Sequence, residues 1–133
     1  MLLKLDNQDL TYRCIGILIK IHNQLGPSLQ EKHYQRAVEL ELNNQNISYE
    51  KEKEVKIMYN NKIIGKYYLD FVIDNKVVLE LKAIYFLNKN SYNQVLGYLN
   101  SMKLKIALLV NFRKTKLEFK RIILPDKYLN KSA

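Results

Sequence analysis

Three charged residues interrupt two otherwise apolar segments of this sequence. Asp70 is the sole charged residue of segment 67–73, and Glu80 and Lys82 are the sole charged residues of segment 77–83. Segments that are apolar on both faces are typical of central strands covered from both sides. A carboxylate there is costly unless it is paired or bound to a metal ion. These three residues are therefore the first candidates for chemistry.

The geometry of the two strands decides whether the three side chains meet. Glu80 and Lys82 share one face, because side chains alternate along a strand. If residues 74–76 form a three-residue loop, Asp70 lies directly opposite Glu80, with Cβ atoms about 4.5–5.5 Å apart. A two-residue loop would place the carboxylates on opposite faces. We predict the three-residue loop.

Two carboxylates this close repel each other and raise a pKa unless a cation lies between them. Mg²⁺ prefers a few carboxylates together with waters and phosphate oxygens. Asp70 and Glu80 therefore predict a site for Mg²⁺ (or Mn²⁺), with Lys82 beside the ion. The alternative is an ion pair of Lys82 with one acid that serves fold specificity alone, which leaves the second acid unexplained.

Glu31 is a third candidate acid. It shares a helical stripe with Tyr34, Val38 and Leu42, so it points toward the core. A competing interpretation is a capping box with Ser28 at the N-cap and Glu31 at the third helical position. From the spacing alone, both interpretations remain open.

Four further residues could have either a functional or an ordinary structural role. Gln94 and Tyr98 lie one turn apart on a predicted helix and could reach the same site, although a polar helix face is the simpler explanation. His22 and His33 match no metal-ligand spacing, and we expect helix-packing or surface roles for both.

The elements that must position these residues follow from hydrophobic periodicity. Residues 10, 14, 17, 21 and 25 form one apolar face of a helix over residues 6–25, which Gly26 and Pro27 end. A second helix is expected after residue 28 to about residue 43, and a third over 88–102. Strands are expected at 50–59, 62–73 (bent near Gly65), 77–83, 105–110 and 116–124. The order α-α-β-β-β-α-β-β predicts an α/β (mixed α+β) fold with a central mixed sheet flanked by helices.

The chain of 133 residues has the length of a single domain, 1–133, and a net charge of +9. Residues 101–133 hold nine Lys and Arg against two acids. Such a surface attracts polyanions, although a Lys- and Asn-rich composition could by itself produce it. Candidate nucleic-acid contacts are Tyr98, Arg113, Lys114, Lys116, Lys120 and Arg121.

Composition also bears on where the protein works. Cys14 is the single cysteine, which excludes an internal disulfide and a cysteine-based zinc cluster. The first ten residues do not resemble a signal peptide, and no run of 18 apolar residues occurs. We expect a cytoplasmic protein without a membrane partner.

These residues carry a resemblance to a known family. Asp70 followed by Glu80-Leu81-Lys82 resembles the D…(D/E)xK signature of the PD-(D/E)xK nuclease superfamily, and the α-β-β-β-α-β order resembles its restriction-endonuclease-like core. Gln94-x-x-x-Tyr98 resembles the QxxxY motif of RecB-like members. Segment 25–34, LGPSLQEKHY, is similar to the defining segment of bacterial GxxExxY proteins, and segments 78–83, 108–112 and 117–121 are also similar to that family.

The resemblance covers roughly residues 10–124, with two departures. Ser28 stands where the family has its motif glycine, and Leu69 replaces the proline before the aspartate. The resemblance implies that Asp70 and Glu80 are metal ligands, that Glu31 is an accessory ligand, and that Lys82 lies beside the nucleophilic water. With these roles we expect the Leu81 carbonyl to complete the metal site and Gln94 to help position the substrate.

The resulting expectation is a Mg²⁺-dependent nuclease that hydrolyses phosphodiester bonds of nucleic acid, with DNA as the expected substrate. The alternative is a non-catalytic module that binds nucleic acid or a partner and retains the nuclease fold. A third hypothesis is a structural accessory subunit, in which Lys82 pairs with the carboxylates of Asp70 and Glu80. RNA against DNA, ends against junctions, and monomer against homodimer stay open.

Overall fold

The computed structural model describes residues 6–129. The predicted domain 1–133 also includes residues 1–5 and 130–133, which lie outside the described residues. The elements are α1 (Asn7–Leu25), α2 (Glu31–Asn44), β1 (Tyr49–Tyr59), β2 (Lys62–Ile73), β3 (Val77–Lys82), α3 (Lys89–Met102), β4 (Ile106–Asn111), β5 (Glu118–Ile123) and α4 (Asp126–Leu129). The predicted order is confirmed, and the short α4 follows it.

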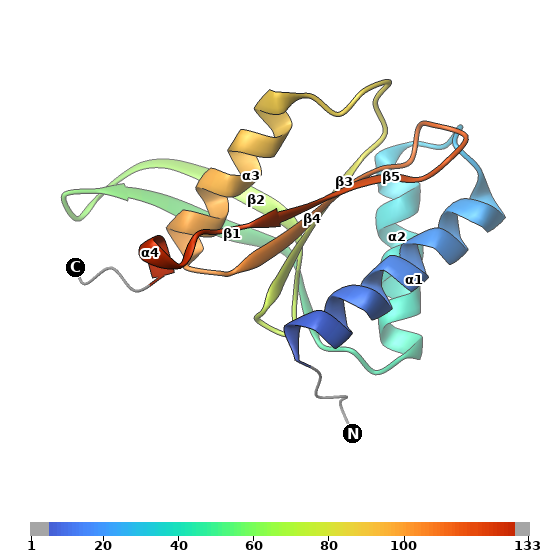
Figure 1. Cartoon of the computed structure of the whole chain (residues 1–133), viewed down its shortest axis with the longest axis horizontal. Helices are drawn as coiled ribbons and strands as arrows, with labels where there is room; N and C mark the ends of the chain where they lie inside the picture. Colours follow the sequence, from blue (N-terminus) through green and yellow to red (C-terminus); the bar gives the residue numbers. More distant parts are fainter. Residues whose placement is uncertain (1–5, 130–133) are drawn as a thin grey trace.

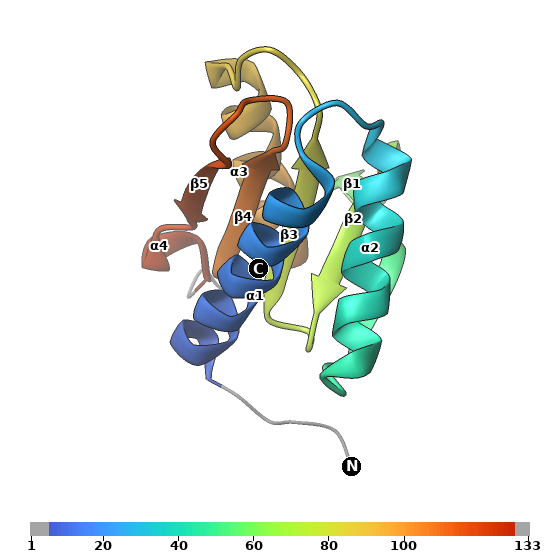
Figure 2. The same cartoon turned by 90° about the vertical axis from the view of Figure 1, so that its right-hand side faces the viewer.

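The strands form one five-stranded sheet in the order β1-β2-β3-β4-β5. β3 and β4 pair in parallel, and the other neighbouring pairs of this sheet are antiparallel. α1 and α2 cover one face and α3 the other, as the two views show (Figures 1 and 2). The predicted mixed sheet flanked by helices is therefore confirmed. No helix within residues 6–129 is long and apolar enough to cross a membrane.

Strand alternation divides the buried side chains between two cores. Leu79, Leu81 and Leu108 pack under α1 and α2, whereas Val78 and Leu109 pack under α3. Because β3 and β4 are buried on both faces, they read as nearly continuous apolar runs. A charged side chain within the buried part of β3, such as Glu80, is therefore almost completely removed from water.

α1 forms where its apolar stripe predicts. Asp6 is its N-cap, and the Asp6 carboxylate accepts the Asp9 N–H at 2.8 Å. The helix ends at Gly26, whose φ of 75° favours a residue without Cβ. His22 is buried, and its Nε2 lies 2.8 Å from the Lys114 carbonyl oxygen, so it has the expected packing role.

α2 begins later than the capping-box interpretation requires. Gln30 is the N-cap and Glu31 the first helical residue, so the capping box of Ser28 and Glu31 is wrong. His33 Nδ1 accepts the Gln30 N–H at 3.2 Å. The turn before the helix is held instead by Tyr34, whose hydroxyl donates to the Gly26 carbonyl at 2.5 Å. The Glu31 side chain is therefore not engaged in capping.

The loop between β2 and β3 has the predicted three residues. Ile73 pairs with Val77, and residues 74 and 75 adopt φ of 51° and 54°, a conformation that Asp and Asn tolerate. This is the loop length on which the meeting of Asp70 and Glu80 depends. The bend expected near Gly65 corresponds to a register shift between Ile57 and Met58 on the partner strand.

Candidate active site

The ladder between β2 and β3 is replaced by side-chain hydrogen bonds at Asp70 and Glu80. Backbone pairing runs from Ile73 with Val77 to Phe71 with Leu79, and the next opposed pair is Asp70 and Glu80. The Asp70 N–H donates to Glu80 Oε1 at 2.7 Å, and the Leu81 N–H donates to Asp70 Oδ2 at 2.7 Å. The two carboxylates thus lie together between the strands, as the loop length predicted.

The other oxygen of each carboxylate is bound by a residue that the sequence analysis missed. Gln35 Nε2 donates to Asp70 Oδ1 at 3.0 Å, and the Tyr67 hydroxyl donates to Glu80 Oε2 at 2.9 Å. A signal existed for Gln35, because it lies one helical turn beyond Glu31. Tyr67 gave no comparable signal.

Tyr98 reaches the pair through Tyr67. The two rings stack with centroids 4.1 Å apart and planes 15° apart. The negative charge of Glu80 adds to the effect of burial in raising the pKa of Tyr98. Gln94 is exposed, and no hydrogen bond joins it to the carboxylates in the described part of the chain. The structure therefore brings one member of the predicted helix pair to the site.

Burial makes both carboxylates reluctant to ionise. Glu80 is 2% exposed, and burial reinforced by the charge of Asp70 raises its pKa from 4.5 to about 7. Burial also raises the pKa of Asp70; Glu31 and Glu52 act in the same direction, while the Leu81 N–H opposes them. Held this way, the pair is a site that favours a proton or a cation.

Lys82 lies next to the pair without forming an ion pair. Its charge lowers the pKa of both Asp70 and Glu80, but none of the ion pairs within residues 6–129 includes Lys82. The Lys82 side chain is half-buried. The acids are satisfied by backbone and neutral donors instead, so the ammonium group remains available to a ligand.

The chemistry of the donor set fits a hard divalent ion. Each of the four carboxylate oxygens accepts one hydrogen bond from the protein, and a carboxylate offers about four lone-pair sites. Each oxygen therefore keeps a lone pair for a cation. Within residues 6–129 no three His, Cys, Asp or Glu side chains converge closely enough to hold a metal. Glu31 contributes its charge to Asp70, and its role as a ligand stays a prediction.

The candidate basic residues do not form one surface. Lys116, Lys120 and Arg121 are exposed, but Lys120 pairs with Leu109 and Arg121 with Leu108, which face opposite sides of the sheet. Arg113 and Lys114 lie in the connection between β4 and β5, at the end of the sheet where β3 ends. Of the candidate basic residues on β5 and before it, Arg113 and Lys114 therefore lie at the end of the sheet where β3 finishes with Lys82.

Asn111 is a further residue that the sequence analysis missed. It is fully buried, and its amide donates to the Ile84 carbonyl at 2.7 Å and accepts the Ile84 N–H at 3.0 Å. It also donates to Glu118 Oε1 at 3.2 Å. Asn111 therefore fixes the segment that follows Lys82.

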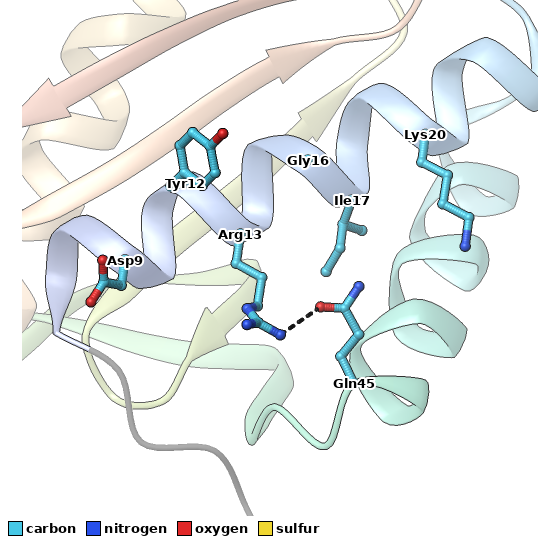
Figure 3. A pocket seen from close by; sticks show the side chains of 7 residues that line it. All are labelled: Asp9, Tyr12, Arg13, Gly16, Ile17, Lys20 and Gln45. Atoms are coloured by element: carbon cyan, nitrogen blue, oxygen red, sulfur yellow. Dashed lines mark hydrogen bonds between the residues drawn. The ribbon is translucent and has the colours of Figure 1, made fainter.

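A hollow of about 440 Å³ lies elsewhere, along α1 (Figure 3). It is lined by Asp9, Tyr12, Arg13, Gly16, Ile17, Lys20 and Gln45. Arg13 Nη1 donates to Gln45 Oε1 across it at 3.3 Å. Neither carboxylate of the β2–β3 pair lines this hollow, so it is distinct from the candidate active site.

Comparison with known proteins agrees with this fold. Residues 8–122 match the family model of the PD-(D/E)XK nuclease superfamily, and the chain belongs to that superfamily. Its members act on nucleic acid and generally use divalent metal ions. The solved structure titled "Crystal structure of SSO0001" is similar with a TM-score of 0.55 and 19% identity, covering 92% of this chain and 70% of that chain. That likeness shows the fold alone. No curated protein matches.

Proposed function

We propose that the protein is a divalent-metal-dependent nuclease of the GxxExxY type that cleaves DNA. The observation that carries this proposal is the opposed pair of Asp70 and Glu80, with Lys82 at the end of β3 and outside the ion pairs found within residues 6–129. Membership of the nuclease superfamily supports the reaction class. Segment 25–34 supports the subgroup.

The residues present would hold Mg²⁺ or Mn²⁺ through Asp70, Glu80 and the Leu81 carbonyl, with Glu31 as an accessory ligand. Such an ion, when bound, lowers the pKa of a water ligand and offsets charge on the attacked phosphate. Hard oxygen donors are the ligands that both ions accept.

The chain's own groups would complete the reaction. The Lys82 ammonium would donate to the attacking water or to a phosphate oxygen, which stabilises developing negative charge. Gln35 and Tyr67 would hold the two carboxylates in place through their hydrogen bonds. Gln94 and Tyr98 would lie along the path of the substrate on α3.

The test is cleavage of DNA with Mg²⁺ or Mn²⁺ by the wild type, Asp70→Asn and Lys82→Ala. We expect EDTA to abolish cleavage and Lys82→Ala to lower its rate about 10²- to 10³-fold, the effect of losing one charge-stabilising donor. Asp9→Asn and Lys20→Ala, on α1, serve as matched controls. Equal activity of wild type, Asp70→Asn and Lys82→Ala would refute the assignment.

A second candidate is a module that binds nucleic acid or a partner without cleaving it. It is favoured by one observation: each of the four carboxylate oxygens already accepts a hydrogen bond from the protein. This module would bind DNA with a strong dependence on salt and none on EDTA. The nuclease would instead lose its activity with EDTA, so one set of assays separates the two.

A further inference from the structure

Two adjacent aromatic side chains are exposed directly after the strand that carries Glu80 and Lys82. Tyr85 is 76% and Phe86 71% exposed, in the connection between β3 and α3. Aromatic rings are costly to leave in water, and contiguous exposed rings commonly mark binding surfaces. Neither ring belongs to the two cores, so the packing of the fold does not explain them.

Each ring lies beside a cation from the connection between β4 and β5. The Arg113 guanidinium carbon is 6.0 Å from the centre of the Tyr85 ring, and Lys114 Nζ is 5.0 Å from the centre of the Phe86 ring. Two segments far apart in sequence thus alternate aromatic faces with positive charge. This combination is complementary to a polyanion that carries aromatic bases.

The backbone beneath the rings is fixed by several hydrogen bonds. Asn111 holds both backbone groups of Ile84, and Arg113 Nη2 donates to the Ala83 carbonyl at 3.2 Å. His22 Nε2 lies 2.8 Å from the carbonyl oxygen of Lys114, and this contact anchors the connection between β4 and β5 to α1. The exposure of the rings is therefore built into the fold rather than left by a loose loop.

The position of the rings connects them with the carboxylate pair. Tyr85 follows Lys82 by three residues, and three residues of extended chain span at most about 10 Å. A nucleic-acid strand with its phosphate at Asp70 and Glu80 would reach the rings with neighbouring nucleotides. Bases paired in a duplex are stacked on one another, so their faces are not free for protein rings.

We propose that Tyr85 and Phe86, with Arg113 and Lys114, form a stacking platform that binds the unpaired bases of single-stranded DNA beside the active site. The rings take the base faces, and the Arg113 guanidinium neutralises an adjoining phosphate. Lys114, which also pairs with Glu118 at 3.3 Å, adds positive charge beside Phe86. This inference rests on the proposed function, because the platform would bind the DNA that the proposed active site cleaves.

The first experiment measures binding without cleavage. Fluorescence anisotropy is recorded for fluorescein-labelled oligo(dT) and for a blunt duplex of equal length, in EDTA, with the full chain. We expect oligo(dT) to bind more tightly than the duplex and Tyr85→Ala/Phe86→Ala to weaken oligo(dT) binding about tenfold or more, the contribution of one stacked base. Tyr12→Ala removes an equally exposed ring (80%) from α1 and should leave binding unchanged.

A second experiment reports stacking directly. The sequence contains no tryptophan, so Tyr85→Trp and Tyr12→Trp each introduce a single reporter. Oligo(dT) should quench the fluorescence of Tyr85→Trp and leave that of Tyr12→Trp unchanged. Because Tyr85→Trp keeps an aromatic face, its affinity should stay close to that of the wild type, and this guards against a misfolded alanine variant.

Three outcomes would overturn the platform: no binding of oligo(dT) at low salt, preference for the duplex, or equal losses in the Tyr85/Phe86 and Tyr12 variants. Tighter binding of oligo(rU) than of oligo(dT) would overturn the assignment to DNA. Failure of the proposed function is separate, because it would appear as absent cleavage with the EDTA binding results intact.

Discussion

Glu52 lies opposite Asp70 in the pairing of β1 with β2, and its backbone is left-handed there, with φ of 53°. The flanking pairs are Lys51 with Phe71 and Lys53 with Leu69, so the ladder is interrupted at the level of the candidate active site. The negative charge of Glu52 also contributes to raising the pKa of Asp70. One exposed residue thus adds backbone strain and charge repulsion next to the carboxylate pair.

We expect Glu52→Gly to stabilise the protein by roughly 1 kcal/mol, because glycine adopts this φ without the steric cost of a Cβ. The measurement is urea denaturation in EDTA. Glu52→Gln is the matched control: it removes the charge and keeps the strained backbone. If Glu52→Gln stabilises as much as Glu52→Gly, the backbone explanation is wrong.

Glu80 should make the stability of the metal-free protein depend on pH. Its folded-state pKa is raised from 4.5 to about 7, so the folded state holds the proton more tightly than the unfolded state. The stabilisation is present below pH 4.5 and is lost as pH rises toward about 7. Glu80→Gln lacks this titration, so its stability relative to the wild type should increase over that interval. If the denaturation midpoints of the wild type and Glu80→Gln change by the same amount between pH 4.5 and 7.5, the prediction is wrong.

Divalent ions should stabilise the folded protein above pH 7, because under the proposed function they bind the native carboxylate pair. With ion at 100 times its Kd, the gain is about 2.7 kcal/mol. We expect the melting temperature to rise with Mg²⁺ or Mn²⁺ concentration in the wild type and much less in Asp70→Asn and Glu80→Gln. Asp9→Asn should behave like the wild type. An equal rise in all variants would show that the ion binds elsewhere.

Asn111→Leu should destabilise the protein by about 2–4 kcal/mol, since it leaves the buried backbone groups of Ile84 without partners. It should also weaken oligo(dT) binding by releasing the segment with Tyr85 and Phe86. Asn111→Asp retains the acceptor for the Ile84 N–H and loses the donor. Unchanged stability in Asn111→Leu would mean that the segment is held by other contacts.

The sequence predicted the parts of this fold that depend on local pattern. The apolar stripe of α1 and the turn residues Asp74 and Asn75 produced the correct helix and loop length, and the loop then placed Asp70 opposite Glu80. The predicted start of α2 was too early. Ser28 and Glu31 match a capping box in sequence, but in the structure the hydroxyl of Tyr34 holds the turn before the helix.

The rest of the site depends on contacts between residues far apart in sequence. Gln35 meets Asp70 across 35 positions, and Asn111 meets Ile84 across 27. No local pattern indicates the partner of Asn111. The position of Gln35 one helical turn beyond Glu31 indicates the site but not the contact with Asp70. The contacts of Tyr85 and Phe86 with Arg113 and Lys114 likewise join segments far apart in sequence, so the sequence alone does not indicate them.

The left-handed residue in β1 has a consequence for association between molecules. β1 is an edge strand of the sheet, and a straight, unpaired edge can add a strand from another copy and begin aggregation. The kink at Glu52 interrupts that edge, and the alternating charges of residues 50–54 discourage pairing along it. The same irregularity that is expected to lower stability beside Asp70 should therefore hinder the addition of a strand at the β1 edge.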